Sequence, residues 1–214
     1  MPELVNNQHL QLFFNEYLLN SAGYVYHKSG ALSRVITDAD IPDYFWIRLN
    51  TTSLRVLIPS LYKKFPNLLV EVEVRTRTPP TVSLNTTGMA LDLDFATELF
   101  VVFSNKTRYS VFTLGIDVAS DVKVWVAEKK LLTGELSLVD FDFHVISSVI
   151  GDLPTAGLKM IVDALCKFGV VPLLNMVLQN GFNIPTFSGI EMLSPQLSHH
   201  QGFIAISTDI KYRP

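Results

Sequence analysis

The sequence has little charge and almost no cysteine. Only 17% of its 214 residues are Asp, Glu, Lys or Arg, and the formal net charge is −3. Its only Lys-Lys doublets, Lys63-Lys64 and Lys129-Lys130, are far apart, so the sequence gives no electrostatic basis for binding nucleic acid. The single cysteine, Cys166, cannot form an internal disulfide, and we expect it to be a buried, inert thiol.

Motifs that carry catalytic chemistry are also missing. The sequence contains no Gly-x-Ser-x-Gly elbow, His-Glu-x-x-His pair, phosphate loop or dinucleotide fingerprint. His199-His200 has no nearby Cys or His to complete a metal site, so it is expected in a solvated loop. Paired carboxylates capable of acid–base chemistry occur twice, as Asp92/Asp94 and Asp140/Asp142, but their alternation is typical of the wet face of a sheet. We therefore expect no enzyme activity, no cofactor and no metal.

The start of the chain and its glycosylation sequons lead to different expectations about secretion. No basic segment leads into an apolar run, as a secretory signal peptide requires. Three N-glycosylation sequons, at Asn50, Asn85 and Asn105, favour a secreted protein. Both observations agree if this chain is the C-terminal piece of a longer secreted precursor, and that is the expectation.

Apolar residues, in contrast, are abundant, at 48% of the chain, and they are densest in a predicted helix over 158–178. Within it only Lys159, Asp163, Lys167 and Asn175 are strongly polar. The three charged residues recur every four positions and form a single stripe. The rest of the helix surface is apolar, which is far more than the roughly 100° arc of an ordinary surface helix.

Three interpretations of this helix are open. A membrane span is disfavoured because three charges and Pro172 interrupt the apolar run. A fully buried core helix would be covered by protein on several sides. Alternatively, its extra apolar face contacts a bound apolar ligand.

The remaining patterns predict one α+β domain over residues 1–214. Helical spacing of bulky residues predicts a first helix over about 7–27, and a short helix is expected over 59–65. Two short extended runs are expected between them, at 31–37 and 44–50. Alternation of apolar and polar residues predicts long antiparallel strands with one wet face, and the clearest runs are 69–75, 89–95, 122–126, 141–144 and 202–212. Such a sheet would be strongly twisted and would curl around the two long helices.

Several short segments spread along nearly the whole chain form a recognisable series: Phe13-Phe14-Asn15, 20–26, Leu61-Tyr62-Lys63-Lys64-Phe65-Pro66-Asn67, Thr78-Pro79-Pro80, Thr87-Gly88, 132–136 and 180–185. This series resembles the C-terminal domain of a family of lipid-transfer and lipopolysaccharide-binding proteins. The family includes bactericidal/permeability-increasing protein, lipopolysaccharide-binding protein, cholesteryl ester transfer protein and the PLUNC proteins. The order and spacing of the segments, rather than any one of them, make the resemblance specific.

The resemblance implies one half of a boomerang-shaped, secreted protein of innate immunity or lipid transfer. In this picture the curled sheet and two helices form an elongated apolar tube that encloses the acyl chains of phospholipid or lipopolysaccharide. The implied protein partner is the missing N-terminal domain, or a second copy that pairs through the open sheet edge. The family's cationic tip and its disulfide belong to that N-terminal domain, which fits the lone Cys166.

We expect the tube wall to come from the apolar sides of the two long helices. The candidate lipid-binding residues are Phe13, Tyr17, Tyr24, Leu158, Ile161, Leu165, Phe168 and Met176. The main alternative is an interaction domain whose tube is filled by its own side chains and which carries no ligand. An esterase acting on lipid is disfavoured by the missing nucleophile motif.

Overall fold

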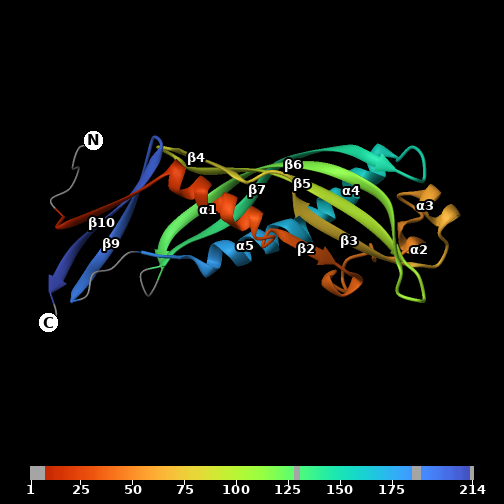
Figure 1. Ribbon diagram of the computed structural model, residues 1–214, viewed down its shortest axis with the longest axis horizontal. Coiled ribbons are helices and arrows are strands. Elements are labelled where there is room, and N and C mark those ends of the chain that lie inside the picture. Colours follow the sequence, from red (N-terminus) through yellow and green to blue (C-terminus); the bar gives the residue numbers. More distant parts are fainter. Residues whose placement is uncertain (1–7, 128–130, 185–188, 213–214) are drawn as a thin grey trace.

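The alternating segments form a seven-stranded antiparallel sheet in the computed structural model, which describes residues 8–127, 131–184 and 189–212. Along the sheet the strands are β2 (Ser33–Ile36), β3 (Leu69–Thr76), β5 (Gly88–Val102), β6 (Arg108–Ala127), β7 (Leu131–Ser148) and β8 (Phe182–Asn183). A further strand, β4 (Thr81–Asn85), pairs with β5 along the same edge as β3. Figure 1 shows β5, β6 and β7 running along the long axis and curling over the helices, so the expected curled sheet is confirmed.

The apolar C-terminal segment forms one helix of 26 residues over Thr155–Asn180. It consists of α4 (Thr155–Leu165), a π-helical turn (Cys166–Val170) and α5 (Val171–Asn180). Pro172 follows the π-helical turn, at the start of α5, and the helix continues past it. The helix is long and apolar enough to cross a membrane, but half of its most apolar stretch is buried in the protein. Such burial is typical of a core helix.

A second, three-stranded sheet lies at one end of the molecule (Figure 1). Its order is β1 (Leu10–Asn15), β10 (Phe203–Tyr212) and β9 (Ile190–His200), all antiparallel. The helix α1 (Glu16–Lys28) connects it to the large sheet. The short helices α2 (Thr51–Leu54) and α3 (Pro59–Lys64) lie at the opposite end.

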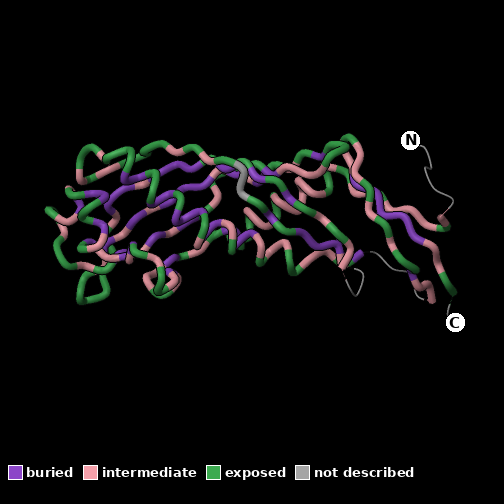
Figure 2. The backbone as a smooth tube through the Cα atoms, turned by 180° about the vertical axis from the view of Figure 1, so that it is seen from behind, coloured by how far each residue is buried: buried purple, intermediate pink, exposed green. Residues whose placement is uncertain are grey.

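The apolar side chains form two cores rather than one. The larger lies between the seven-stranded sheet and α4–α5, and Phe95, Ile116 and Leu158 are among its fully buried side chains. The smaller joins the two sheets around Leu84 and Ile206. Buried residues follow the long strands and reach into both ends of the molecule, where exposed residues lie among them (Figure 2).

Three expectations about local structure were wrong. The predicted helix over 7–27 is a strand followed by a helix, because 10–15 pairs with β10 and the Asn15 side chain caps α1 by accepting a hydrogen bond from Leu18 N–H at 2.9 Å. The expected strand at 44–50 is irregular, and only Asn50 forms a bridge, with Leu69. His199-His200 lies in β9, opposite Ile204 and Phe203, and not in a loop.

Candidate binding groove

An apolar groove of about 100 Å³ opens between α1 and α5, with β4 and β5 as its floor. Leu19, Ala22 and Tyr26 line it from α1, while Leu174, Val177 and Leu178 line it from α5. The floor contains Val82, Met89, Leu91 and Leu93. A smaller hollow of about 30 Å³ shares Leu19, Met89, Leu178 and Phe182 with it and extends it toward Ile204. The lining is therefore almost wholly hydrocarbon, which suits an apolar ligand.

The groove exists because α1 has an apolar face that the protein does not seal. Leu19, Ala22, Gly23 and Tyr26 recur at the spacing of one helix face and all line the groove. Nevertheless, no residue of α1, which is described in full, is buried. Val82 and Met89 of the floor pack against both hydrophobic cores, so the groove lies where the two cores meet without merging.

Polar side chains of α1 hold this helix over the free edge of β4. Asn20 donates from Nδ2 to the carbonyl of Val82 at 3.1 Å and accepts from the Val82 N–H at 2.7 Å. Glu16 accepts from the N–H of Leu84 at 2.6 Å. These bonds substitute for those of a neighbouring strand. They fix α1 at the groove without burying its apolar face.

Asn20→Ala is expected to lower the free energy of unfolding by about 1.5 kcal/mol, because it removes both hydrogen-bond partners of Val82. Urea unfolding measures this directly. Asn183→Ala changes an exposed asparagine of β8 and should stay within about 0.5 kcal/mol of the parent. Equal effects of the two substitutions would mean that Asn20 does not anchor α1.

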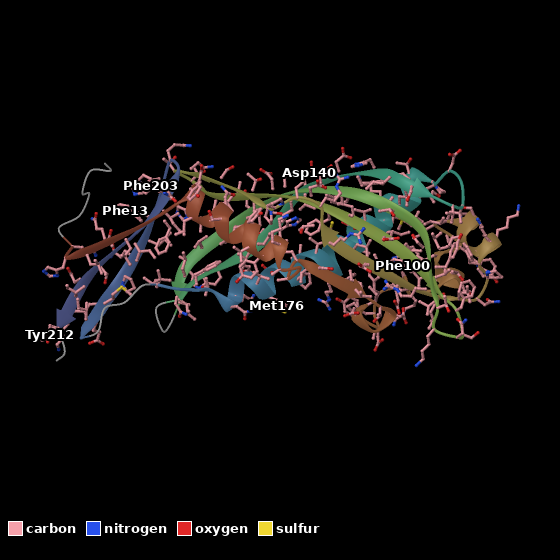
Figure 3. All side chains as sticks on the ribbon, in the orientation of Figure 1. Phe13, Phe100, Asp140, Met176, Phe203 and Tyr212 are labelled. Atoms are coloured by element: carbon pink, nitrogen blue, oxygen red, sulfur yellow. The ribbon has the colours of Figure 1, made fainter. Side chains whose placement is uncertain are left out.

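None of the eight predicted lipid-binding residues lines the groove. Leu158, Ile161 and Leu165 are buried in the larger core, and Phe168 packs edge-on against Phe45 with ring centroids 4.8 Å apart. Tyr17, Tyr24 and Met176 are mainly exposed on α1 and α5. Figure 3 shows Phe13 beside Phe203, far along the molecule from Met176. Contact of these eight predicted residues with lipid stays a prediction.

The groove-lining face of α1 could have been predicted from the small residues Ala22 and Gly23, which leave space beside a helix. Ala22 and Gly23 lie on the face of α1 that lines the groove, whereas bulk alone selected Tyr17 and Tyr24, which are exposed. A Cβ atom on Gly23 would lie 3.3 Å from the carbonyl oxygen of Pro80. The segments around Gly23 and Pro80, both part of the family resemblance, are therefore in contact.

The predicted wet face of the sheet is confirmed. Asp92, Asp94, Asp140 and Asp142 line a hollow of about 350 Å³ on the outer face, together with Asp117. Arg77 pairs with Asp94 at 2.6 Å between Nε and Oδ1. Among the described residues no cluster of His, Cys, Asp and Glu is arranged to hold a metal ion.

The sequon asparagines differ in exposure. Asn85, the last residue of β4, and Asn105, in the turn between β5 and β6, are both exposed. Each side chain accepts a hydrogen bond from a backbone N–H two residues later. Asn50 is half-buried, and its side chain caps α2 by accepting from the Ser53 N–H at 2.7 Å. Glycosylation remains a prediction, and exposure favours Asn85 and Asn105.

Cys166 is expected to resist alkylation in the folded protein. It is fully buried, and burial, with a smaller contribution from the charge of Asp163, raises the pKa of its thiol to about 12. Iodoacetamide at about pH 8 should therefore label it only after denaturation, because the thiolate is the reactive form. Mass spectrometry measures the labelled fraction, and rapid labelling of native protein would contradict the expectation.

The comparisons with known proteins agree with this architecture. Residues 2–212 match the model of the LBP / BPI / CETP family, C-terminal domain. The chain is 28% identical over 212 residues to bactericidal permeability-increasing protein of Sebastes schlegelii, covering 99% of this chain and 44% of that protein. It is 25% identical over 213 residues to human lipopolysaccharide-binding protein, covering 99% and 44%.

A solved structure shows the same fold. The crystal structure of lipopolysaccharide binding protein superposes with a TM-score of 0.65 at 22% identity, over 96% of this chain and 44% of that one. The chain thus spans less than half the length of these relatives. The family match covers nearly the whole sequence, and this chain belongs to the LBP / BPI / CETP family, whose C-terminal domain it represents.

Proposed function

We propose that this domain binds lipid without enzymatic activity, by enclosing acyl chains in the groove between α1 and α5. The observation that carries the proposal is the apolar face of α1, which lines the groove while no α1 residue is buried. The names of the relatives, lipopolysaccharide-binding protein among them, support a lipid ligand with long acyl chains. Phospholipid and lipopolysaccharide are the two candidate ligands.

Burial of hydrocarbon supplies the binding energy. Each methylene group removed from water contributes about 0.8 kcal/mol. The groove and its extension hold only a short length of chain as they stand, at about 100 and 30 Å³. A longer length requires α1 to move outward, which breaks its hydrogen bonds to Val82 and Leu84. The polar headgroup stays at the mouth, where it keeps its hydration.

Membership of the family also supports a proposal about the protein to which this domain belongs. We propose that it acts as part of a secreted protein of innate immunity or lipid transfer, with Asn85 and Asn105 as its exposed glycosylation sites. Both β1 and β9 are edge strands of the three-stranded sheet. Either edge can pair with a strand of an N-terminal domain of this family or of a second copy.

One observation favours a second candidate, an interaction domain without a ligand. The interior under α4 is filled by side chains, including Ile36, Phe95 and Leu165. If the groove also closes in solution, the domain would dock a partner while another part of the protein binds lipid.

Native mass spectrometry of gently purified protein separates the two functions. Lipid binding predicts a mass shift equal to one or more lipids, which organic extraction releases for identification. A protein that remains empty after incubation with phospholipid and lipopolysaccharide vesicles would contradict the groove's proposed role and support the interaction domain.

A further inference from the structure

The end of the molecule opposite β9 and β10 differs in charge from the rest of the chain (Figure 1). Residues 51–68, which include α2 and α3, contain Arg55, Lys63 and Lys64 but no Asp or Glu, although the whole chain has a net charge of −3. Lys106, in the turn between β5 and β6, adds a further cation at this end. These residues therefore form a positively charged segment in a chain that is acidic overall.

Within the described part of the chain, none of these cations forms an ion pair with a carboxylate. Arg55 is the one arginine among the described residues that forms no ion pair with a carboxylate. Its guanidinium lies over the ring of Tyr62 instead, 5.9 Å from the centroid. Lys64 donates from Nζ to the carbonyl of Val149 at 2.6 Å, and this bond leaves its charge without a carboxylate partner. Arg55, Lys63 and Lys64 are all exposed.

Apolar side chains are exposed beside the cations. Val56 follows Arg55 and is 73% exposed, and Val149, which contacts Lys64, is 45% exposed. Beside Val149 lies a hollow of about 450 Å³ lined by Ser60, Lys63, Lys64, Val149 and Ile150. The hydroxyl of Ser60 is buried there and has no hydrogen-bond partner in the described structure. A phosphate group entering the hollow would find the ammonium groups of Lys63 and Lys64.

We propose that this cationic end, Arg55, Lys63 and Lys64 with the neighbouring Val56 and Val149, docks onto an anionic lipid membrane. Unpaired cations attract phosphate headgroups, and exposed aliphatic side chains enter the headgroup region. This combination fits a membrane better than a soluble anion, which would use the charges but leave Val56 and Val149 in water.

The outer face of the sheet sets the orientation. Asp92, Asp94, Asp117, Asp140 and Asp142 line the hollow there, and Asp140 lies near the middle of the long axis (Figure 3). Their negative charge repels an anionic membrane, so the domain contacts it by its end and not by its side. The groove between α1 and α5 lies outside the contact and stays accessible.

Vesicle flotation tests the proposal with protein made without glycans, because Asn105 is next to Lys106. The parent should bind phosphatidylcholine vesicles containing about 30 mol% phosphatidylserine and should bind pure phosphatidylcholine vesicles at least about tenfold less. The variant Arg55→Gln/Lys63→Gln/Lys64→Gln should lose roughly 100-fold in partitioning, since each juxtamembrane cation contributes about fivefold.

The matched control carries the same charge change elsewhere. Lys28→Gln/Lys123→Gln/Lys211→Gln removes three exposed lysines outside the cationic end and should stay within about threefold of the parent. If the first variant unfolds, Arg55→Gln/Lys63→Gln keeps the bond of Lys64 to Val149 and should still lose about 25-fold.

Several outcomes overturn the proposal. Equal losses in test and control variants would mean that net charge alone acts. Equal binding to both vesicle types would mean that the charges of the cationic end are irrelevant, and full displacement by inorganic phosphate would identify a soluble-anion site. The groove variant Ala22→Trp should bind vesicles like the parent, so failure of the lipid-groove proposal leaves this result unchanged.

Discussion

Ala22→Trp is expected to abolish lipid loading while the domain stays folded. Ala22 lines the groove from α1 and is only half-buried, so the indole ring can occupy the groove without displacing core side chains. A groove of about 100 Å³ has no room for both an indole and an acyl chain. We expect at least a tenfold loss of affinity for a fluorescent phospholipid, equal to about 1.4 kcal/mol, and no co-purifying lipid by native mass spectrometry.

The control for this variant is the same substitution at an exposed helix position. Ala156 lies in the first turn of α4, outside the groove, and Ala156→Trp should load lipid like the parent. Thermal unfolding of both variants shows whether the fold is intact. Normal lipid loading by a well-folded Ala22→Trp protein would place the lipid elsewhere, for example along the predicted wall residues Leu158, Ile161 and Leu165.

Gly157→Ala is expected to destabilise the domain by about 3 kcal/mol. An added Cβ at Gly157 would overlap the carbonyl oxygen of Leu57 and lie 2.9 Å from its carbonyl carbon. Backbone atoms cannot rotate away as a side chain can, so α4 must shift from the segment between α2 and α3. Alanine favours helix over glycine by about 1 kcal/mol, and this gain is smaller than the cost of the shift.

Urea unfolding gives the measurement, and Gly88→Ala is the matched control. A Cβ atom at Gly88 would meet no atom within 4 Å, so its effect should be within about 0.5 kcal/mol. A stability of Gly157→Ala equal to that of the parent would show that α4 does not pack against the Leu57 backbone as closely as in this structure. Because α2 and α3 flank Leu57 and belong to the cationic end, a shift of α4 would also disturb that end of the molecule.

Much of the sheet could be predicted from the sequence because alternation is a local property. Side chains of a strand point to opposite faces with a period of two, so Leu91 and Leu93 must face inward when Asp92 and Asp94 face water. The end of the apolar helix also depends on a local signal, because Gly181 has a positive φ of 66° that other residues rarely adopt.

The start of α1 could not be predicted, because it depends on a distant part of the chain. Residues 10–15 have an apolar spacing that also suits a helix, but β10, almost 200 residues later, offers them a strand partner. The backbone bonds of that pairing outweigh local preference, and the helix begins only after Asn15. Phe13 consequently lies in a sheet and not on the predicted helix ridge.

The sequence by itself determined the fold class, the wet and dry faces of the long strands, and an excess of apolar surface. Only the tertiary structure decided where that excess remains uncovered. Along α4 the apolar helix is buried in the larger core through Leu158, Ile161 and Leu165. In contrast, α1 is hydrogen-bonded to β4 through Asn20 and Glu16 and leaves the groove beside it open. Periodicity shows which face of an element is apolar, but whether a face is filled depends on side chains from distant segments.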